Sequence, residues 1–103
     1  MFKIYLSGPI TGIPDYKARF KAAEKRMRDG VTVVINPARQ PEGMNRTEYM
    51  RRALSDVCDC DMVYLLRGWE YSHGARIERD LALYLDKVVA YEEVPEQDED
   101  AAE

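Results

Sequence analysis

The apolar residues of the chain gather in four short runs that alternate with amphipathic or polar stretches. The runs cover residues 2–6, 31–35, 61–66 and 87–91, and they are rich in β-branched and aromatic side chains. Short runs of this composition predict strands. The run at 31–35 is continuous, which is typical of a strand covered on both faces.

Between these runs, apolar residues recur at helical spacing. We predict helices over residues 15–29, in the stretch that follows Asn45, and over residues 73–86. Asn45 and Ser72 carry short polar side chains that can cap the second and third helices. The core face of the last helix is predicted to consist of Ile77, Leu81, Tyr84 and Leu85.

Strands that alternate with crossover helices predict an α/β fold with a parallel sheet. We expect three layers: a Rossmann-like or flavodoxin-like sheet of four to five strands with helices on both faces. Residues 1–91 would form this single domain, and residues 92–103 an acidic, disordered tail. Ligands of such sheets bind beyond the carboxyl ends of the strands, which selects segments 7–12, 36–44 and 67–74.

Charge is unevenly distributed along the 103 residues. The chain carries 15 Lys and Arg against 19 Asp and Glu, a formal net charge of −4. Seven acidic residues and no basic ones lie between Glu92 and Glu103, so residues 1–91 carry 12 acidic against 15 basic residues, a net charge of +3. A positive charge this modest argues against strong binding of nucleic acid.

Membrane insertion, disulfide bonding and metal binding are not expected either. No apolar run approaches the ~18 residues of a membrane-spanning helix. Cys58 and Cys60 are poorly spaced for a mutual bridge, so we expect both to be reduced, as in a cytoplasmic protein. Together with Asp59 and Asp61 they resemble a metal site only superficially, because no second Cys/His cluster is present to complete four ligands.

Two of the selected segments suit an anionic ligand. The loop Ser7-Gly8-Pro9-Ile10-Thr11-Gly12 offers glycines and hydroxyls that fit a phosphate, although a tight turn without a ligand explains it equally well. Ser72 and Gly74 place a hydroxyl and open amides at a helix N-terminus, which is a natural anion site.

Glu78 is the strongest catalytic candidate. It lies on the core-facing flank of the last helix, beside Ile77 and between Ala75 and Ala82, where desolvation would raise its pKa. The alternative is a solvated carboxylate paired with Arg79, which is the commoner situation for a helical Glu.

Three neighbouring side chains are weaker candidates. His73 could act as a general acid, or simply be solvated at the start of its helix. Trp69 and Tyr71 could stack on a base, or pack over the edge of the core.

These residues resemble the nucleoside 2-deoxyribosyltransferase-like proteins, in particular a small bacterial and phage branch related to the deoxynucleoside 5′-monophosphate N-glycosidases. The resemblance extends over about residues 1–91. Three segments carry it: Ile4-Tyr5-Leu6-Ser7-Gly8-Pro9-Ile10-Thr11-Gly12, Asn36-Pro37-Ala38 and Gly68-Trp69-Glu70-x-Ser72-x-Gly74-Ala75-x-x-Glu78.

The resemblance implies a role for each matching residue. Glu78 would be the nucleophile that attacks the anomeric carbon of the sugar, Tyr5 would orient its carboxylate, and Ser72 would hold a 5′-phosphate. The other implied substrate contacts are Ser7, Gly8, Pro9, Ile10, Thr11, Gly12, Asn36, Trp69 and Gly74. Well-studied family members carry an Asp in the helix before the third strand, near the sugar, that helps the base leave, and an ungapped alignment places Ala53 at that position in this chain.

The favoured activity is hydrolysis of the base–sugar bond of a nucleoside 5′-monophosphate through a covalent glycosyl-Glu78 intermediate, with deoxyribosyl transfer as a related outcome. No cofactor is expected. A module that binds a nucleotide without turnover is the alternative, and Ala53 motivates it. Cleavage of NAD ranks below both. The resemblance also implies a homodimer or a higher homo-oligomer.

Overall fold

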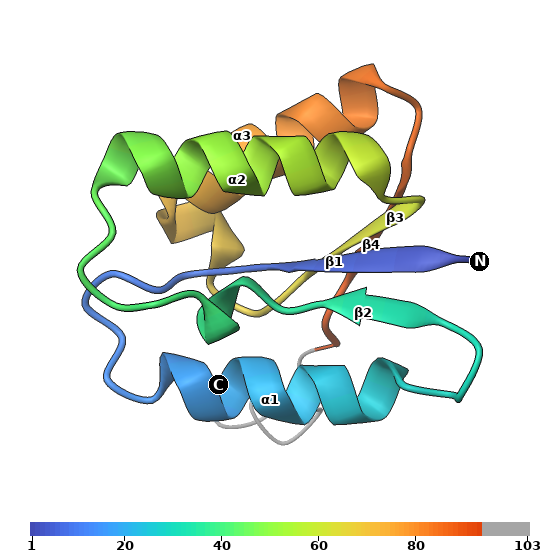
Figure 1. Cartoon of the computed structure of the whole chain (residues 1–103), viewed down its shortest axis with the longest axis horizontal. Coiled ribbons are helices and arrows are strands. Elements are labelled where there is room, and N and C mark those ends of the chain that lie inside the picture. The colour runs from blue at the N-terminus through green and yellow to red at the C-terminus, as the bar shows by residue number, and fades with distance from the viewer. Residues whose placement is uncertain (94–103) are drawn as a thin grey trace, which may run out of the picture.

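Residues 1–93, the part of the chain that the computed structural model describes, form a four-stranded parallel sheet with helices on both faces (Figure 1). The strands are β1 (Lys3–Ser7), β2 (Val33–Ile35), β3 (Met62–Leu65) and β4 (Val88–Tyr91), in the order β2-β1-β3-β4. The predicted parallel α/β sheet is confirmed, with four strands. Most of the predicted tail, residues 94–103, lies outside the described residues.

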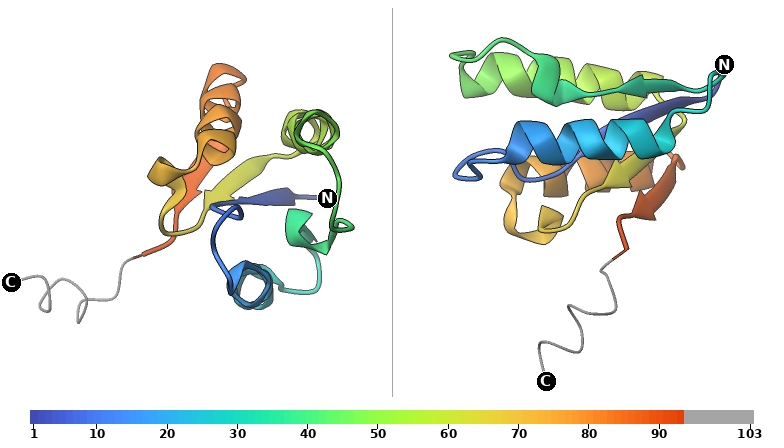
Figure 2. Two further views of the ribbon diagram at one scale, coloured as in Figure 1. Left: turned by 90° about the vertical axis from the view of Figure 1, so that its left-hand side faces the viewer. Right: turned by 90° about the horizontal axis from the view of Figure 1, so that it is seen from below.

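Three helices cover the sheet, and two short 3₁₀ helices follow β2 and β3. They are α1 (Tyr16–Met27), η1 (Pro37–Arg39), α2 (Arg46–Asp59), η2 (Trp69–Tyr71) and α3 (His73–Tyr84). The chain steps from β1 to β2 in one direction and then crosses back over β1 to β3. Because crossovers are right-handed, α1 lies on one face and α2 and α3 lie on the other (Figure 2).

The central strand β1 contributes to a core on each face, since successive side chains of a strand point in opposite directions. Ile4 and Leu6 are buried with Phe20 of α1. Tyr5 is fully buried on the opposite face, beneath α2 and α3. Ser7, two residues further along the strand, shares that face and is also buried.

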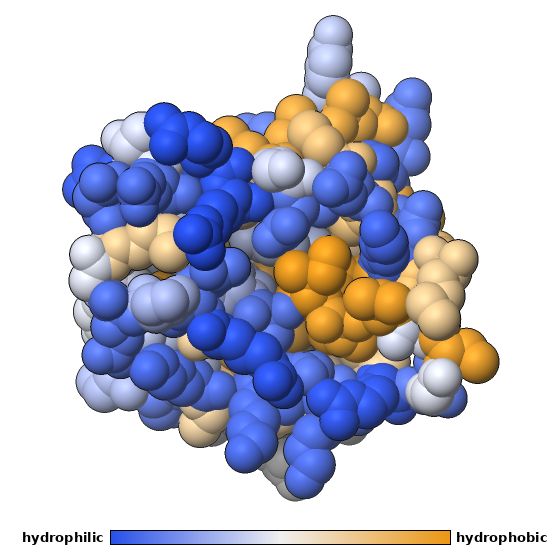
Figure 3. Space-filling view, in the orientation of Figure 1, coloured by the Kyte–Doolittle hydropathy of each residue, from blue (hydrophilic) through white to orange (hydrophobic). Residues whose placement is uncertain are grey.

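The prediction that residues 31–35 are covered on both faces is wrong. Val31 precedes the strand with 69% of its surface exposed, and Val33 is 37% exposed. The reason is that β2 is an edge strand: α1 packs against it on one face, whereas α2 packs mainly against β1 on the other. Figure 3 shows apolar atoms reaching the surface in the region of β2.

The predicted core face of α3 is also wrong, except at Leu81. Ile77 is 49% exposed, Tyr84 is 84% exposed and Leu85 is 38% exposed, while Leu81 is partly buried. The buried positions are instead Ala75, Glu78 and Ala82. The small side chains of Ala75 and Ala82 allow α3 to lie close to the sheet. The larger apolar side chains lie on the other sides of the helix.

No helix among residues 1–93 is long and apolar enough to cross a membrane. Within the same described range, no group of three or more His, Cys, Asp or Glu side chains is placed to hold a metal ion. Cys58 is exposed and Cys60 is buried, and both are free thiols. A cytoplasmic location stays a prediction.

Candidate active site

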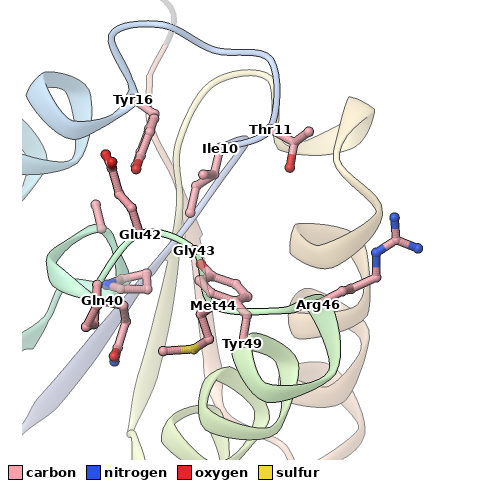
Figure 4. Close-up of a pocket in the computed structure, with 12 residues that line it drawn as sticks. Ile10, Thr11, Tyr16, Gln40, Glu42, Gly43, Met44, Arg46 and Tyr49 are labelled. Atoms are coloured by element: carbon pink, nitrogen blue, oxygen red, sulfur yellow. The ribbon is translucent and has the colours of Figure 1, made fainter.

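Two adjoining cavities open at the carboxyl ends of the strands. The larger, which we call the Glu78 cleft, has a volume of about 880 Å³ and is lined by Gly8, Pro9, Ile10, Thr11, Ile13, Arg46, Tyr49, Met50, Gly68, Tyr71, Ser72, His73, Gly74, Ala75, Ile77 and Glu78. The smaller, which we call the side chamber, has a volume of about 410 Å³ and is lined by Ile10, Thr11, Tyr16, Pro37, Ala38, Gln40, Pro41, Glu42, Gly43, Met44, Arg46 and Tyr49 (Figure 4).

All three segments selected from the strand ends contribute to these cavities. Segments 7–12 and 67–74 line the Glu78 cleft, and segment 36–44 lines the side chamber. The two cavities share Ile10, Thr11, Arg46 and Tyr49. The two cavities therefore lie next to each other along the edge of the sheet.

Glycine allows the loops after β1 and β3 to approach each other. A Cβ atom at Gly8 would lie only 3.0 Å from the Cβ atom of Leu66. Gly68 has a φ of +87°, and a Cβ atom there would lie 3.3 Å from Cγ of Pro9. A larger residue at either position would push the two walls of the Glu78 cleft apart.

Two hydroxyl groups of the central strand β1 hold the Glu78 carboxylate from the side of the sheet. Glu78 is only 3% exposed, although it lines the cleft. The Tyr5 hydroxyl donates to Oε2 over 3.0 Å, and the Ser7 hydroxyl donates to Oε1 over 2.6 Å. Since both oxygens have a donor, the carboxylate has a fixed position and orientation.

Burial raises the pKa of Glu78 to about 7. The hydrogen bonds from Ser7 and Tyr5 oppose this rise because they stabilise the charged form, while the charge of Asp56 adds to it. A carboxylate with such a pKa is about half ionised at neutral pH and is more basic than an ordinary Glu. These are properties of a catalytic nucleophile or base.

Tyr49 also belongs to the site, although no motif in the sequence singles it out. It projects from α2 and lines both cavities. Burial raises the pKa of its hydroxyl well above the ordinary value, the charge of Glu78 raises it further, and a hydrogen bond with Tyr5 acts in the opposite direction. In Figure 4, Tyr49 extends toward Ile10, and Arg46 points away from the side chamber.

The N-terminus of α3 forms one end of the Glu78 cleft. The Ser72 side chain accepts a hydrogen bond from the backbone N–H of Ala75 over 3.2 Å, which confirms the predicted cap. A hydroxyl can accept this bond and still donate one to a ligand. Ser72, His73 and Gly74 all line the cleft at this point, where unpaired N–H groups and the helix dipole favour an anion.

Besides Ser7, three predicted contact residues lie outside the lining of both cavities. Asn36 donates to Oε1 of Glu24 over 3.0 Å and caps η1 through the N–H of Ala38. The Trp69 ring packs at 5.5 Å from the Tyr91 ring. Gly12 is exposed in the turn after β1. Tyr5 and Ser7 do not line the cavities either, but they contact Glu78 directly.

A second buried carboxylate, Glu24 of α1, was not anticipated. It is 5% exposed and accepts hydrogen bonds from Asn36, Arg39 and Arg28. Burial alone would raise the pKa of Glu24, but these hydrogen bonds outweigh it and hold the pKa below its ordinary value. Glu24 thereby fastens η1, a wall of the side chamber, to α1.

Comparison with known proteins gives one family and one fold. The family described as "Domain of unknown function (DUF4406)" matches residues 2–91. No curated protein sequence matches the chain. Among solved structures, a 2-desoxiribosyltransferase from Leishmania mexicana is similar to it, with a TM-score of 0.72 and 21% identity. The match covers 88% of this chain but 63% of that one, so the chain spans less than two thirds of that enzyme. The likeness confirms the expected fold.

Proposed function

The chain belongs to the DUF4406 family, and we propose that this member is an N-glycosidase that hydrolyses the base–sugar bond of a nucleoside 5′-monophosphate. The observation that carries the proposal is the buried Glu78 carboxylate, held by Tyr5 and Ser7 at the wall of a cleft large enough for a nucleotide. The fold shared with a 2-desoxiribosyltransferase supports chemistry at a sugar–base bond.

In the proposed reaction, a Glu78 carboxylate oxygen attacks the anomeric carbon and the bond from that carbon to the base nitrogen breaks. A glycosyl ester of Glu78 results. Water then attacks the anomeric carbon and restores the carboxylate, so one difficult displacement is divided into two. Tyr5 and Ser7 contribute by holding the carboxylate in position throughout.

The phosphate would bind at the N-terminus of α3, where Ser72 and Gly74 line the cleft. Loop residues Gly8 to Thr11 line the same cleft and would enclose the sugar. With the phosphate and sugar placed in this way, the base extends toward the side chamber. The two cavities adjoin there, so the leaving group would have a compartment of its own.

The assay is incubation of the purified protein with a panel of ribo- and deoxyribonucleoside 5′-monophosphates, followed by chromatography of the free base. We expect release from at least one monophosphate and much less from the matching nucleoside, because the nucleoside lacks the group that Ser72 and Gly74 would hold. Tight calorimetric binding with the nucleotide recovered intact would favour the binding module and contradict hydrolysis.

Ser7→Ala removes the donor at 2.6 Å from Oε1 of Glu78. Because that hydrogen bond stabilises the ionised carboxylate, its loss raises the pKa of Glu78 further. We expect the rising limb of the pH–activity profile to move to higher pH by about one unit. Ser72→Ala is the matched control: it should raise KM for the monophosphate and leave the pH of the rising limb unchanged.

We extend the proposal to a homodimer or higher homo-oligomer. Large side chains of α3 and the residue after it are exposed, including Ile77, Leu83, Tyr84 and Leu85. Figure 3 shows apolar atoms gathered over the C-terminal end of α3. Sedimentation velocity should therefore find a dimer or larger species that Leu83→Glu dissociates. A monomer at every concentration would contradict this assembly.

A further inference from the structure

The proposed reaction needs a proton donor for the departing base, because the bond pair leaves with the base nitrogen. The resemblance expects an Asp on α2, but the chain has Ala53, which is 3% exposed and packed in the core. Among the described residues that line the cavities, α2 contributes only Arg46, Tyr49 and Met50. None of these is a carboxylic acid.

We propose that Tyr49 is the general acid, whose hydroxyl donates its proton to the leaving base. The inference rests on the proposed function and assigns a catalytic role within it. Tyr49 lies one helical turn before Ala53, on the same face of α2. Its hydroxyl can therefore donate a proton to the leaving group from the same helix that carries the Asp in the family that the chain resembles.

The position of Tyr49 suits this role. It lines both the Glu78 cleft and the side chamber, so it lies where the bond between sugar and base would cross from one cavity to the other. Its ring packs against the core that contains Tyr5. Because the ring is packed, the hydroxyl is presented at a defined place and little entropy is lost on binding.

Other proton donors along the cavities are placed less well. Tyr16 lines only the side chamber, and its hydroxyl lies on the side of Glu42 (Figure 4). His73 is exposed and lines only the Glu78 cleft, beside the proposed phosphate site at the start of α3. Neither side chain spans the junction of the two cavities.

The two steps balance. In the first, the bond from a Glu78 oxygen to the anomeric carbon forms, the carbon–nitrogen bond breaks, and the Tyr49 proton moves to the base nitrogen. This leaves neutral base, a glycosyl ester and a Tyr49 phenolate. In the second, water attacks the anomeric carbon and gives one proton to the phenolate, while the ester oxygen leaves with its electron pair. The products are free sugar phosphate, the Glu78 carboxylate and the Tyr49 hydroxyl.

The charge of Glu78 couples the proton transfer to the attack. After burial, that charge is the main cause of the raised pKa of Tyr49. When Glu78 becomes an ester, its negative charge disappears and the Tyr49 hydroxyl becomes a stronger acid. The proton is thus retained in the resting enzyme and becomes easier to donate as the base departs.

The test compares a purine nucleoside 5′-monophosphate that the enzyme accepts with its N7-methylated form. The methylated base is cationic in the substrate and leaves without needing a proton. Tyr49→Phe should lower kcat for the unmodified substrate by about 100-fold or more, and should leave the N7-methylated substrate nearly unchanged. Tyr91→Phe is the matched control: Tyr91 packs on Trp69 and lines neither cavity, so its substitution should affect neither substrate. Tyr49→His restores an acid and should recover part of the lost rate.

Two results would overturn the inference. An equal loss on both substrates would mean that Tyr49 acts through structure or binding, and full activity of Tyr49→Phe on the unmodified substrate would mean that it is dispensable. If the unmutated protein released base from neither substrate, the proposed function would fail first and the inference would fall with it. The wild-type measurement therefore tests the function, and the variant ratio tests Tyr49.

Discussion

Glu78→Ala is expected to lower kcat/KM for base release by more than about 1000-fold. The carboxylate is the group that would bond to the anomeric carbon, and both of its oxygens are already oriented by hydroxyls of β1. Ala cannot form that bond.

The matched control for this substitution is Glu70→Ala, since Glu70 is exposed in η2 and lines neither cavity. It should retain nearly full activity. A chromatographic assay over several days has the sensitivity to follow a loss of this size. Base release that is undiminished in Glu78→Ala would rule out the nucleophile and with it the proposed mechanism.

Glu78→Gln is expected to stabilise the protein, and to do so more at pH 8 than at pH 5. Glu78 has a pKa of about 7 in the folded state against an ordinary 4.5. A raised pKa means that the folded state binds the proton more tightly than the unfolded state does. The stabilisation is complete below pH 4.5 and is lost as the pH rises through 7.

Gln does not titrate, so it escapes this loss. The difference in free energy of unfolding between Glu78→Gln and wild type should grow by about 2–3 kcal/mol from pH 5 to pH 8. Urea titrations at the two pH values measure it, with Glu70→Gln as the control that should show little change. A difference independent of pH would mean that Glu78 titrates as an ordinary surface carboxylate does.

Most of the fold was predictable because the chain's local signals agree with its topology. The alternation of apolar runs with amphipathic stretches predicted the parallel sheet, and the caps at Asn45 and Ser72 are present. The buried face of α3 was not predictable from periodicity. Helical spacing identifies an apolar stripe, but it cannot say whether the sheet or a partner covers that stripe. The buried side of α3 is made of alanines and a carboxylate, which hydrophobic patterning does not register.

The candidate site was predictable to a similar extent. Glu78 and Tyr5, 73 residues apart in sequence, are in contact as the resemblance implied. The contact of Ser7 with Glu78 could have been predicted, because Ser7 lies two residues after Tyr5 and therefore on the same face of the strand. For Glu24 the signal was partial: Arg28 lies four residues after it, at the usual spacing of a helical ion pair, but Arg39 of η1 lies 15 residues away and reaches it only through the whole fold.

The Glu24 network has a consequence for how the substrate range of such a protein can change. It fixes the wall of the side chamber from the α1 face of the sheet, whereas Glu78 is held from the α3 face. Substitutions at wall positions such as Ala38 or Met44 leave the hydroxyl partners of Glu78 untouched. If the proposed function holds, a lineage can therefore exchange the leaving group that it accepts by single steps, each of which keeps the Glu78 carboxylate intact.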